Sequence, residues 1–176
     1  KTFIGSLEHP HWTDILEEQL GRPIDRAALR AERGVLQGEC NAELAPLPGV
    51  VRLIDELAAT GTALAVASSS SADWVHGHLG GHGLFDRFAA VATGDEVART
   101  KPDPAVYLLA CERLGVSPCD AVAIEDSVNG VAAAKAAGML AVAVPGTLTR
   151  GMDFGAADLE VGSCVDLSPE RLASLF

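Results

Sequence analysis

The sequence predicts an α/β fold in which helices cover both faces of a mainly parallel sheet. From Val50 onward, short apolar runs of strand length alternate with longer helical patterns, and this alternation is typical of parallel sheets. The runs are apolar throughout, as expected for strands that are buried on both faces. Polar residues directly follow several runs, at the edge of such a sheet where ligands bind. The residues before Val50 show helical spacing only, which predicts a small separate unit.

Residues 1–46 are predicted to form a small helical domain, followed by an α/β domain of residues 47–176. Apolar residues recur at helical spacing up to Gly21, and Asp25 is placed to cap a second helix. The boundary is expected in Ala-Pro-Leu-Pro-Gly, residues 45–49, because stiff prolines beside a glycine are typical of a hinge.

The elements of the α/β domain follow from the apolar runs and from the residues that stop them. Glycine ends helices, as at Gly61 and Gly138, and serine begins them, as at Ser127. The expected helices cover 50–60, 74–79 before a break at Gly80 and Gly81, 105–114 and 128–137, and the expected strands cover 63–67, 88–92, 121–124, 140–144 and 159–161.

Composition argues against several classes of partner. The net charge is -11 at pH 7, and no basic cluster is present, which argues against binding to nucleic acid or to an anionic membrane. The cysteines form no C-x-x-C pair, so we expect free thiols in a reducing compartment. Neither a signal peptide nor an apolar run of roughly 18 residues is visible. We therefore expect a cytoplasmic protein with a small-molecule partner, and its oligomeric state stays open.

Glu125 and Asp126 form a pair of adjacent carboxylates directly after the strand expected at 121–124. Ser127 then caps a helix, so both acids lie at the carboxyl end of a buried strand. Oxygen ligands without a nearby cysteine or histidine suit a hard cation such as Mg²⁺. The alternative is that both acids only cap the next helix and interact with its dipole.

Ser68 and Lys101 are the other candidate site residues. Ser68 directly follows a strand, and its hydroxyl can converge with the amides of Ser69 and Ser70 on an anion at a helix N-terminus. Lys101 precedes Pro-Asp-Pro and a helix, and a fixed ammonium there would neutralise phosphate charge and keep nearby carboxylates ionised. The serines also suit an ordinary capping loop, and the lysine suits a solvated surface.

In their order and spacing, these segments resemble the haloacid dehalogenase superfamily of phosphotransferases over nearly the whole chain. Residues 67–70 look like its second motif, residues 101–104 like its third and residues 124–130 like its fourth. Residues 3–49 resemble the later part of the helical cap in the β-phosphoglucomutase-like branch. The resemblance implies a Rossmann-like three-layer sandwich with a small cap, and a hydrolase that acts as a magnesium-dependent phosphatase on a small phosphate monoester such as a sugar phosphate.

The resemblance also implies roles for the candidate residues. Ser68 and Lys101 are the expected catalytic residues, since Ser68 would hydrogen-bond the phosphoryl group and Lys101 would hold both that group and the nucleophile. Ser69 joins them in phosphate binding. Asp126 would ligate Mg²⁺, and Glu125 would do so directly or through water. Such a site acts by positioning and by charge stabilisation.

The sequence departs from the family pattern at the nucleophile. The motif Asp-x-Asp-Gly-Thr, which supplies the attacking aspartate and a general acid/base, is absent from these 176 residues. In the family, the strand that carries it lies between the strands that end at Ser68 and Glu125, so its absence would leave a split sheet with unpaired inner edges. We therefore expect upstream residues that contain the first strand and the first cap helix.

Substrate choice is expected to depend on the cap, where His9 and His11 follow Gly5 near the substrate entrance. In β-phosphoglucomutases a cap arginine after that glycine grips the second phosphate, whereas Glu8 stands near its place here. This difference favours a phosphatase. The alternatives are a β-phosphoglucomutase-like phosphotransferase and an inactive binding module. An Asp-x-Asp motif in the upstream residues would exclude the inactive binding module, since both enzymes need it.

Overall fold

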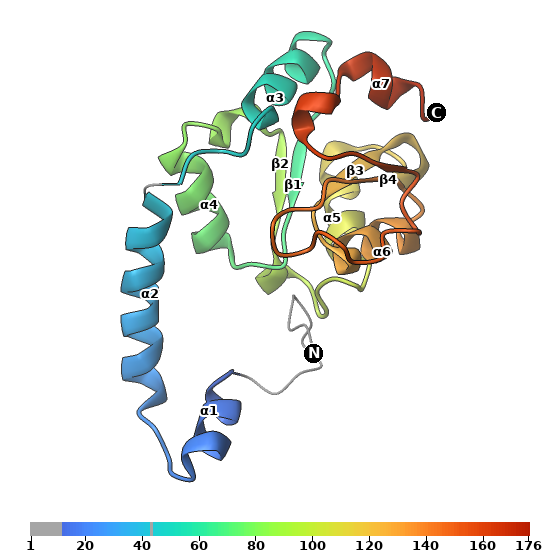
Figure 1. Cartoon of the computed structure of the whole chain (residues 1–176). Helices are drawn as coiled ribbons and strands as arrows, with labels where there is room; N and C mark the ends of the chain where they lie inside the picture. The colour runs from blue at the N-terminus through green and yellow to red at the C-terminus, as the bar shows by residue number, and fades with distance from the viewer. Residues whose placement is uncertain (1–11, 43) are drawn as a thin grey trace. The chain divides into compact units, whose positions relative to one another are not determined.

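The computed structural model of the chain describes residues 12–42 and 44–176 (Figure 1). The chain divides into two compact units, with the boundary between Ala45 and Pro46. The sequence predictions for His9, His11 and their neighbours lie outside the described residues. No helix within the described ranges is both long and apolar enough to cross a membrane.

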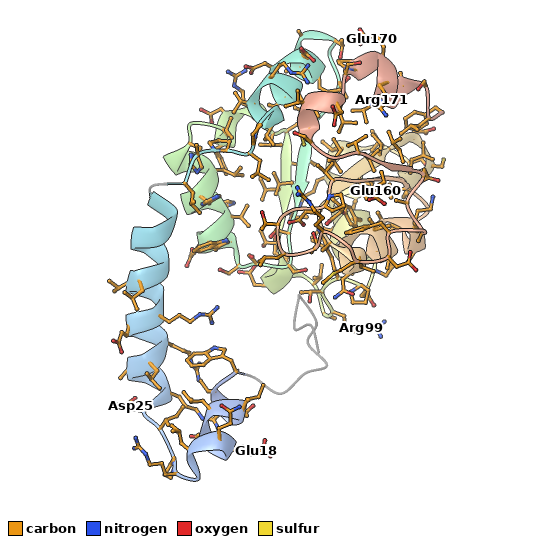
Figure 2. All side chains as sticks on the ribbon, viewed as in Figure 1. Glu18, Asp25, Arg99, Glu160, Glu170 and Arg171 are labelled. Atoms are coloured by element: carbon orange, nitrogen blue, oxygen red, sulfur yellow. The ribbon has the colours of Figure 1, made fainter. Side chains whose placement is uncertain are left out.

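The smaller unit contains α1 (Trp12–Leu20) and α2 (Arg26–Ala42). Gly21 follows α1 with a φ of 62°, a conformation that glycine adopts without a steric penalty. Asp25 stands at the start of α2 (Figure 2), and its Oδ1 accepts hydrogen bonds from the amides of Ala27 at 3.1 Å and Ala28 at 2.9 Å. The predicted helix cap at Asp25 is therefore confirmed.

The larger unit alternates helices and strands in the order that the sequence predicts, and every strand pair in it is parallel. The strands form two separate sheets, in the orders β1-β2 and β3-β4-β5, so β1 and β3 are each paired on one side only. In order, the elements are α3 (Val50–Ala59), β1 (Ala65–Ala67), α4 (Ala72–Gly81), β2 (Ala90–Ala92), α5 (Ala105–Leu114), β3 (Val122–Glu125), α6 (Val128–Ala136), β4 (Leu140–Ala143), β5 (Leu159–Glu160) and α7 (Pro169–Ala173), with single 3-10 turns at 85–87, 94–96, 118–120 and 164–166.

Both faces of β4 are covered, which makes the larger unit a three-layer structure. Ala141 and Ala143 belong to a core cluster built with α5 and α6, whereas Val142 between them belongs to a second cluster that includes Leu53 of α3 and Leu172 of α7. Because successive side chains of a strand point to opposite faces, the two clusters lie on opposite sides of the sheet. The predicted α/β fold with a mainly parallel sheet is confirmed.

Two local predictions were wrong. The helix α4 does not break at Gly80 and Gly81 but continues through Gly81, since a glycine near a helix end costs only about 1 kcal/mol. The strand before the acid pair is not buried on both faces: Ala123 and Glu125 are buried, whereas Ile124 is 37% exposed. Ile124 points to the other face of β3, and its exposure shows that this face of the strand is only partly covered.

Candidate active site

The candidate residues lie where β1 and β3 end. Glu125 is the last residue of β3, and Asp126 follows it directly. Ser68 follows Ala67, the last residue of β1. Lys101 lies in the turn that precedes α5, and its peptide bond to the next residue is cis. The carboxyl ends of two parallel strands and one connecting turn thus supply the predicted side chains, as open α/β sheets do.

Lys101 joins the ends of the two sheets. Its Nζ donates to the carbonyl oxygen of Ala67 at 2.9 Å and to Oε1 of Glu125. The side chains of the ion pair are 12% exposed for Lys101 and 7% exposed for Glu125. A buried ammonium that is held by a main-chain carbonyl and a carboxylate has little rotational freedom, so its charge is fixed at this edge.

Three further groups enclose the Glu125 carboxylate. The Tyr107 hydroxyl donates to Oε1, and the Ser127 hydroxyl donates to Oε2 at 3.3 Å. Gly130, in the first turn of α6, lies so close to the carboxylate that a Cβ on it would not fit. Burial, the negative charge of Glu125 and the hydrogen bond to it raise the pKa of Tyr107 far above its usual range, so the phenol stays a donor.

Asp126 differs from its neighbour because its side chain is exposed. Its carbonyl oxygen accepts a hydrogen bond at 2.6 Å from the hydroxyl of Thr149, which is 4% exposed. Its carboxylate makes no hydrogen bond or ion pair to any residue that the structure describes. The main chain is therefore anchored while the carboxylate stays available, which suits a group that binds a cation from solvent.

In the loop of residues 68–71, more hydrogen-bonding groups are already paired than the sequence suggests. Oγ of Ser68 accepts from the amide of Ser70 at 3.1 Å, and Ser71 caps α4. The first amide of α4, that of Ala72, donates to the carboxylate of Asp95 at 3.1 Å. The predicted convergence of successive amides on an anion is thus wrong for Ser70, whose amide is already paired.

Two donors of this loop remain available to bind an anion, namely one hydroxyl and one amide. The Ser68 hydroxyl retains its hydrogen to donate, and the amide of Ser69 donates to no group in the described part of the chain. The close packing of Gly94 against the carbonyl of Ser69 fixes this segment, because a Cβ on Gly94 would overlap that carbonyl.

The structure brings Lys101 and Glu125 into direct contact, whereas Ser68 and Asp126 are linked to them only as chain neighbours of Ala67 and Glu125. Sequence reasoning missed Tyr107, Gly130 and Thr149. Tyr107 carried a usable signal, since it is the single tyrosine of these 176 residues and lies in the first turn of the helix that follows Lys101, among apolar residues. No comparable signal marked Thr149.

The donor set fits a magnesium ion better than a softer metal. Within residues 12–42 and 44–176, no group of three or more histidine, cysteine or acidic side chains is arranged to hold a metal. Mg²⁺ does not need such a group, since it binds through one or two carboxylates together with water and phosphate oxygens. The two carboxylates that could hold it are those of Asp126, which is exposed, and of Glu125, which is held in a fixed orientation.

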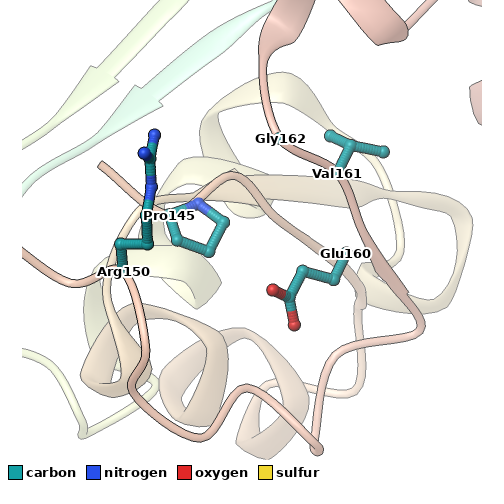
Figure 3. A pocket seen from close by; sticks show the side chains of 5 residues that line it. All are labelled: Pro145, Arg150, Glu160, Val161 and Gly162. Carbon is teal, nitrogen blue, oxygen red and sulfur yellow. The ribbon is translucent and has the colours of Figure 1, made fainter. Parts of the chain in front are cut away.

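A hollow of about 290 Å³ lies at the ends of β4 and β5, lined by Pro145, Arg150, Glu160, Val161 and Gly162 (Figure 3). Figure 3 shows Arg150 and Glu160 on either side of Pro145. Arg150 directly follows Thr149, so the loop that borders the hollow is also the loop that anchors Asp126. None of the lining residues is hydrogen-bonded to Lys101 or Glu125.

Comparison with known proteins identifies relatives for most of the chain. Residues 3–138 match the model of the haloacid dehalogenase-like hydrolases. The chain is 41% identical over 157 residues to the phosphatase-named protein YhcW of Bacillus subtilis, a match that covers 88% of this chain and 70% of the relative. Across three curated relatives that it matches, the chain spans 52% to 70% of their length.

Solved structures support the same relationship. CbbY of Rhodobacter sphaeroides, solved in complex with xylulose 1,5-bisphosphate, is 37% identical with a TM-score of 0.73, covering 82% of this chain and 68% of that protein. A Thermotoga maritima protein described as a β-phosphoglucomutase is 29% identical with a TM-score of 0.77, covering 95% of this chain and 77% of that protein. The predicted β-phosphoglucomutase-like branch is therefore confirmed.

Proposed function

Because the chain belongs to the haloacid dehalogenase-like hydrolases, we propose that it forms the core of a magnesium-dependent phosphatase that hydrolyses a small phosphate monoester. The observation that carries this proposal is the buried Lys101–Glu125 pair, which spans the ends of β1 and β3 beside the free carboxylate of Asp126. A fixed cation next to a free carboxylate suits a phosphate that arrives with a divalent metal.

Each candidate residue has a defined task in this proposal. The Ser68 hydroxyl and the Ser69 amide donate to phosphoryl oxygens, and Lys101 holds both the phosphoryl group and the nucleophile by charge. Asp126 holds Mg²⁺ with its free carboxylate, and Glu125 does so directly or through water. When bound, Mg²⁺ neutralises phosphate charge and orients the phosphoryl group.

The nucleophile is proposed to be an aspartate in a segment upstream of these residues. β1 and β3 each have one unpaired edge, and Lys101 links their carboxyl ends. A parallel strand between them would complete one continuous sheet. A carboxylate oxygen at the end of that strand would attack phosphorus as the ester P–O bond breaks, and the leaving alcohol would take a proton from a second acid. Water would then hydrolyse the aspartyl-phosphate.

The substrate is proposed to be a sugar phosphate or a sugar bisphosphate. Support comes from CbbY, whose solved complex contains xylulose 1,5-bisphosphate, and from the phosphatase-named YhcW. Residues 1–46 are proposed to act as the helical cap that selects the substrate. The free thiols of Cys111, Cys119 and Cys164 support a reducing compartment such as the cytoplasm.

Phosphate release from a panel of sugar phosphates, sugar bisphosphates and an aryl phosphate tests the proposal. The protein would be assayed together with its upstream segment, with Mg²⁺ and with a chelator. We expect release that requires Mg²⁺ and favours one of the sugar esters. Release that persists in the chelator would refute the metal role. Interconversion of glucose phosphates with a bisphosphate primer, without net release, would favour the mutase instead.

A further inference from the structure

Tyr107 contacts both members of the Lys101–Glu125 pair. Its hydroxyl donates to Oε1 of Glu125, and its ring centroid lies 4.7 Å from Nζ of Lys101. The side chain is 6% exposed and comes from the buried face of α5. A buried hydroxyl that is directed at one carboxylate oxygen beside a cation fixes the orientation of that carboxylate.

The two oxygens of Glu125 are used differently. Oε1 accepts from both Lys101 and Tyr107, so its hydrogen-bonding capacity is filled. Among the described residues, Oε2 accepts only from Ser127, at 3.3 Å, and keeps one acceptor direction free. Gly130 of α6 packs against the carboxylate, since a Cβ at that position would overlap it. Of the two oxygens, Oε2 is therefore the one with acceptor capacity left for a cation or for a water bound to it.

We propose that Tyr107 is a positioning residue that keeps Glu125 in this arrangement, so that Oε2 alone is presented to Mg²⁺ or to its bound water. The inference rests on the proposed function, because it takes Mg²⁺ as the cation of the site. Without the Tyr107 hydroxyl, Oε1 loses one of its two donors, and the carboxylate is held less firmly by Lys101 and Ser127. The affinity for Mg²⁺ then falls although no ligand has been removed.

Tyr107→Phe tests this role because it removes the hydroxyl and keeps the ring beside Lys101. Isothermal titration calorimetry on the protein together with its upstream segment measures the dissociation constant for Mg²⁺ without relying on turnover. We expect this constant to rise about tenfold, which is a usual effect of removing a group that orients a metal ligand. Val106→Ala is the matched control, since Val106 is the fully buried neighbour on α5 and makes no hydrogen bond to Glu125. Its dissociation constant is expected to equal that of the wild type.

The outcomes separate the possible explanations. An unchanged constant in Tyr107→Phe, or an equal rise in both variants, would overturn the positioning role. If the wild type binds no Mg²⁺, the magnesium-dependent function is refuted together with this inference. If instead Tyr107→Phe does not fold, a second measurement keeps the hydroxyl and labels its ring. Fluorotyrosine incorporated site-specifically at position 107 is expected to give a ¹⁹F signal that shifts on addition of Mg²⁺, and a signal that Mg²⁺ leaves in place would overturn the proposal.

Discussion

Replacement of Lys101 by methionine should destabilise the protein far more than loss of an ordinary surface lysine. The variant leaves Glu125 buried without its cation and the carbonyl of Ala67 without its donor. Removing one partner of a buried ion pair costs about 3–5 kcal/mol. Because Tyr107 and Ser127 still donate to Glu125, we expect the lower end, about 3 kcal/mol, and a fall in Tm of roughly 6–12 °C for a chain of this size.

Lys135→Met provides the matched control for this prediction. Lys135 pairs with Asp158 at 2.7 Å, but the two side chains are 35% and 29% exposed. Loss of such an exposed pair is expected to cost at most about 1 kcal/mol. Urea unfolding of both variants and of Lys101→Met/Glu125→Gln, in which neither charge is left unpaired, measures the difference. The reasoning is refuted if Lys101→Met costs no more than Lys135→Met, or if the double variant is less stable than the single one.

Two further predictions concern the groups around Glu125. Gly130→Ala should destabilise the protein by about 1–3 kcal/mol because its methyl group would overlap the carboxylate. Gly77→Ala, also within a helix but with open space around it, should gain roughly 0.5–1 kcal/mol, and similar values for both in urea unfolding would contradict the account. The raised pKa of Tyr107 means that the folded chain holds the phenolic proton more tightly than the unfolded chain. The associated stability is complete below the ordinary tyrosine pKa of about 10 and is lost as the pH rises above it. The absorbance of tyrosinate should therefore appear only with unfolding, and ionisation near the ordinary pKa in a chain that circular dichroism shows to be folded would disprove this.

The sequence was sufficient for the fold because helical and strand patterns alternate without ambiguity after Val50. The helix at 105–114 is correct to the residue, since proline precedes it and Gly115 follows it with a φ of 68°. Strand boundaries were less accurate. The strand expected at 63–67 starts at Ala65, because strand length depends on the partner, and β2 pairs from Ala90 onward.

The candidate site could be predicted only where motif residues are adjacent in the chain or follow a strand. Ser68, Lys101 and Glu125 were found in this way. The contact of Lys101 with the carbonyl of Ala67 could not be predicted, because every residue has a main-chain oxygen and the sequence does not mark this one. Likewise, an apolar helix pattern cannot show that Tyr107 turns its hydroxyl toward a carboxylate.

The adjacent acids Glu125 and Asp126 look equivalent in sequence but have different environments. Glu125 is the buried end of β3 and is held by several donors, whereas Asp126 is exposed and its carboxylate has no partner among residues 12–42 and 44–176. This difference follows from the alternation of a strand and from the turn that begins α6.

The most direct test of the account is the magnesium-dependent kcat/KM of Asp126→Asn compared with that of Asp120→Asn. Both variants remove one negative charge near β3, but Asp120 is exposed in the 3-10 turn that precedes the strand, at the end opposite to the candidate site. We expect Asp126→Asn to lower kcat/KM at least about 100-fold, since charge stabilisation by a bound metal ion is worth several kcal/mol. Asp120→Asn should match the wild type. Equal activity of the two variants would contradict the assignment of Asp126 as the metal-binding carboxylate.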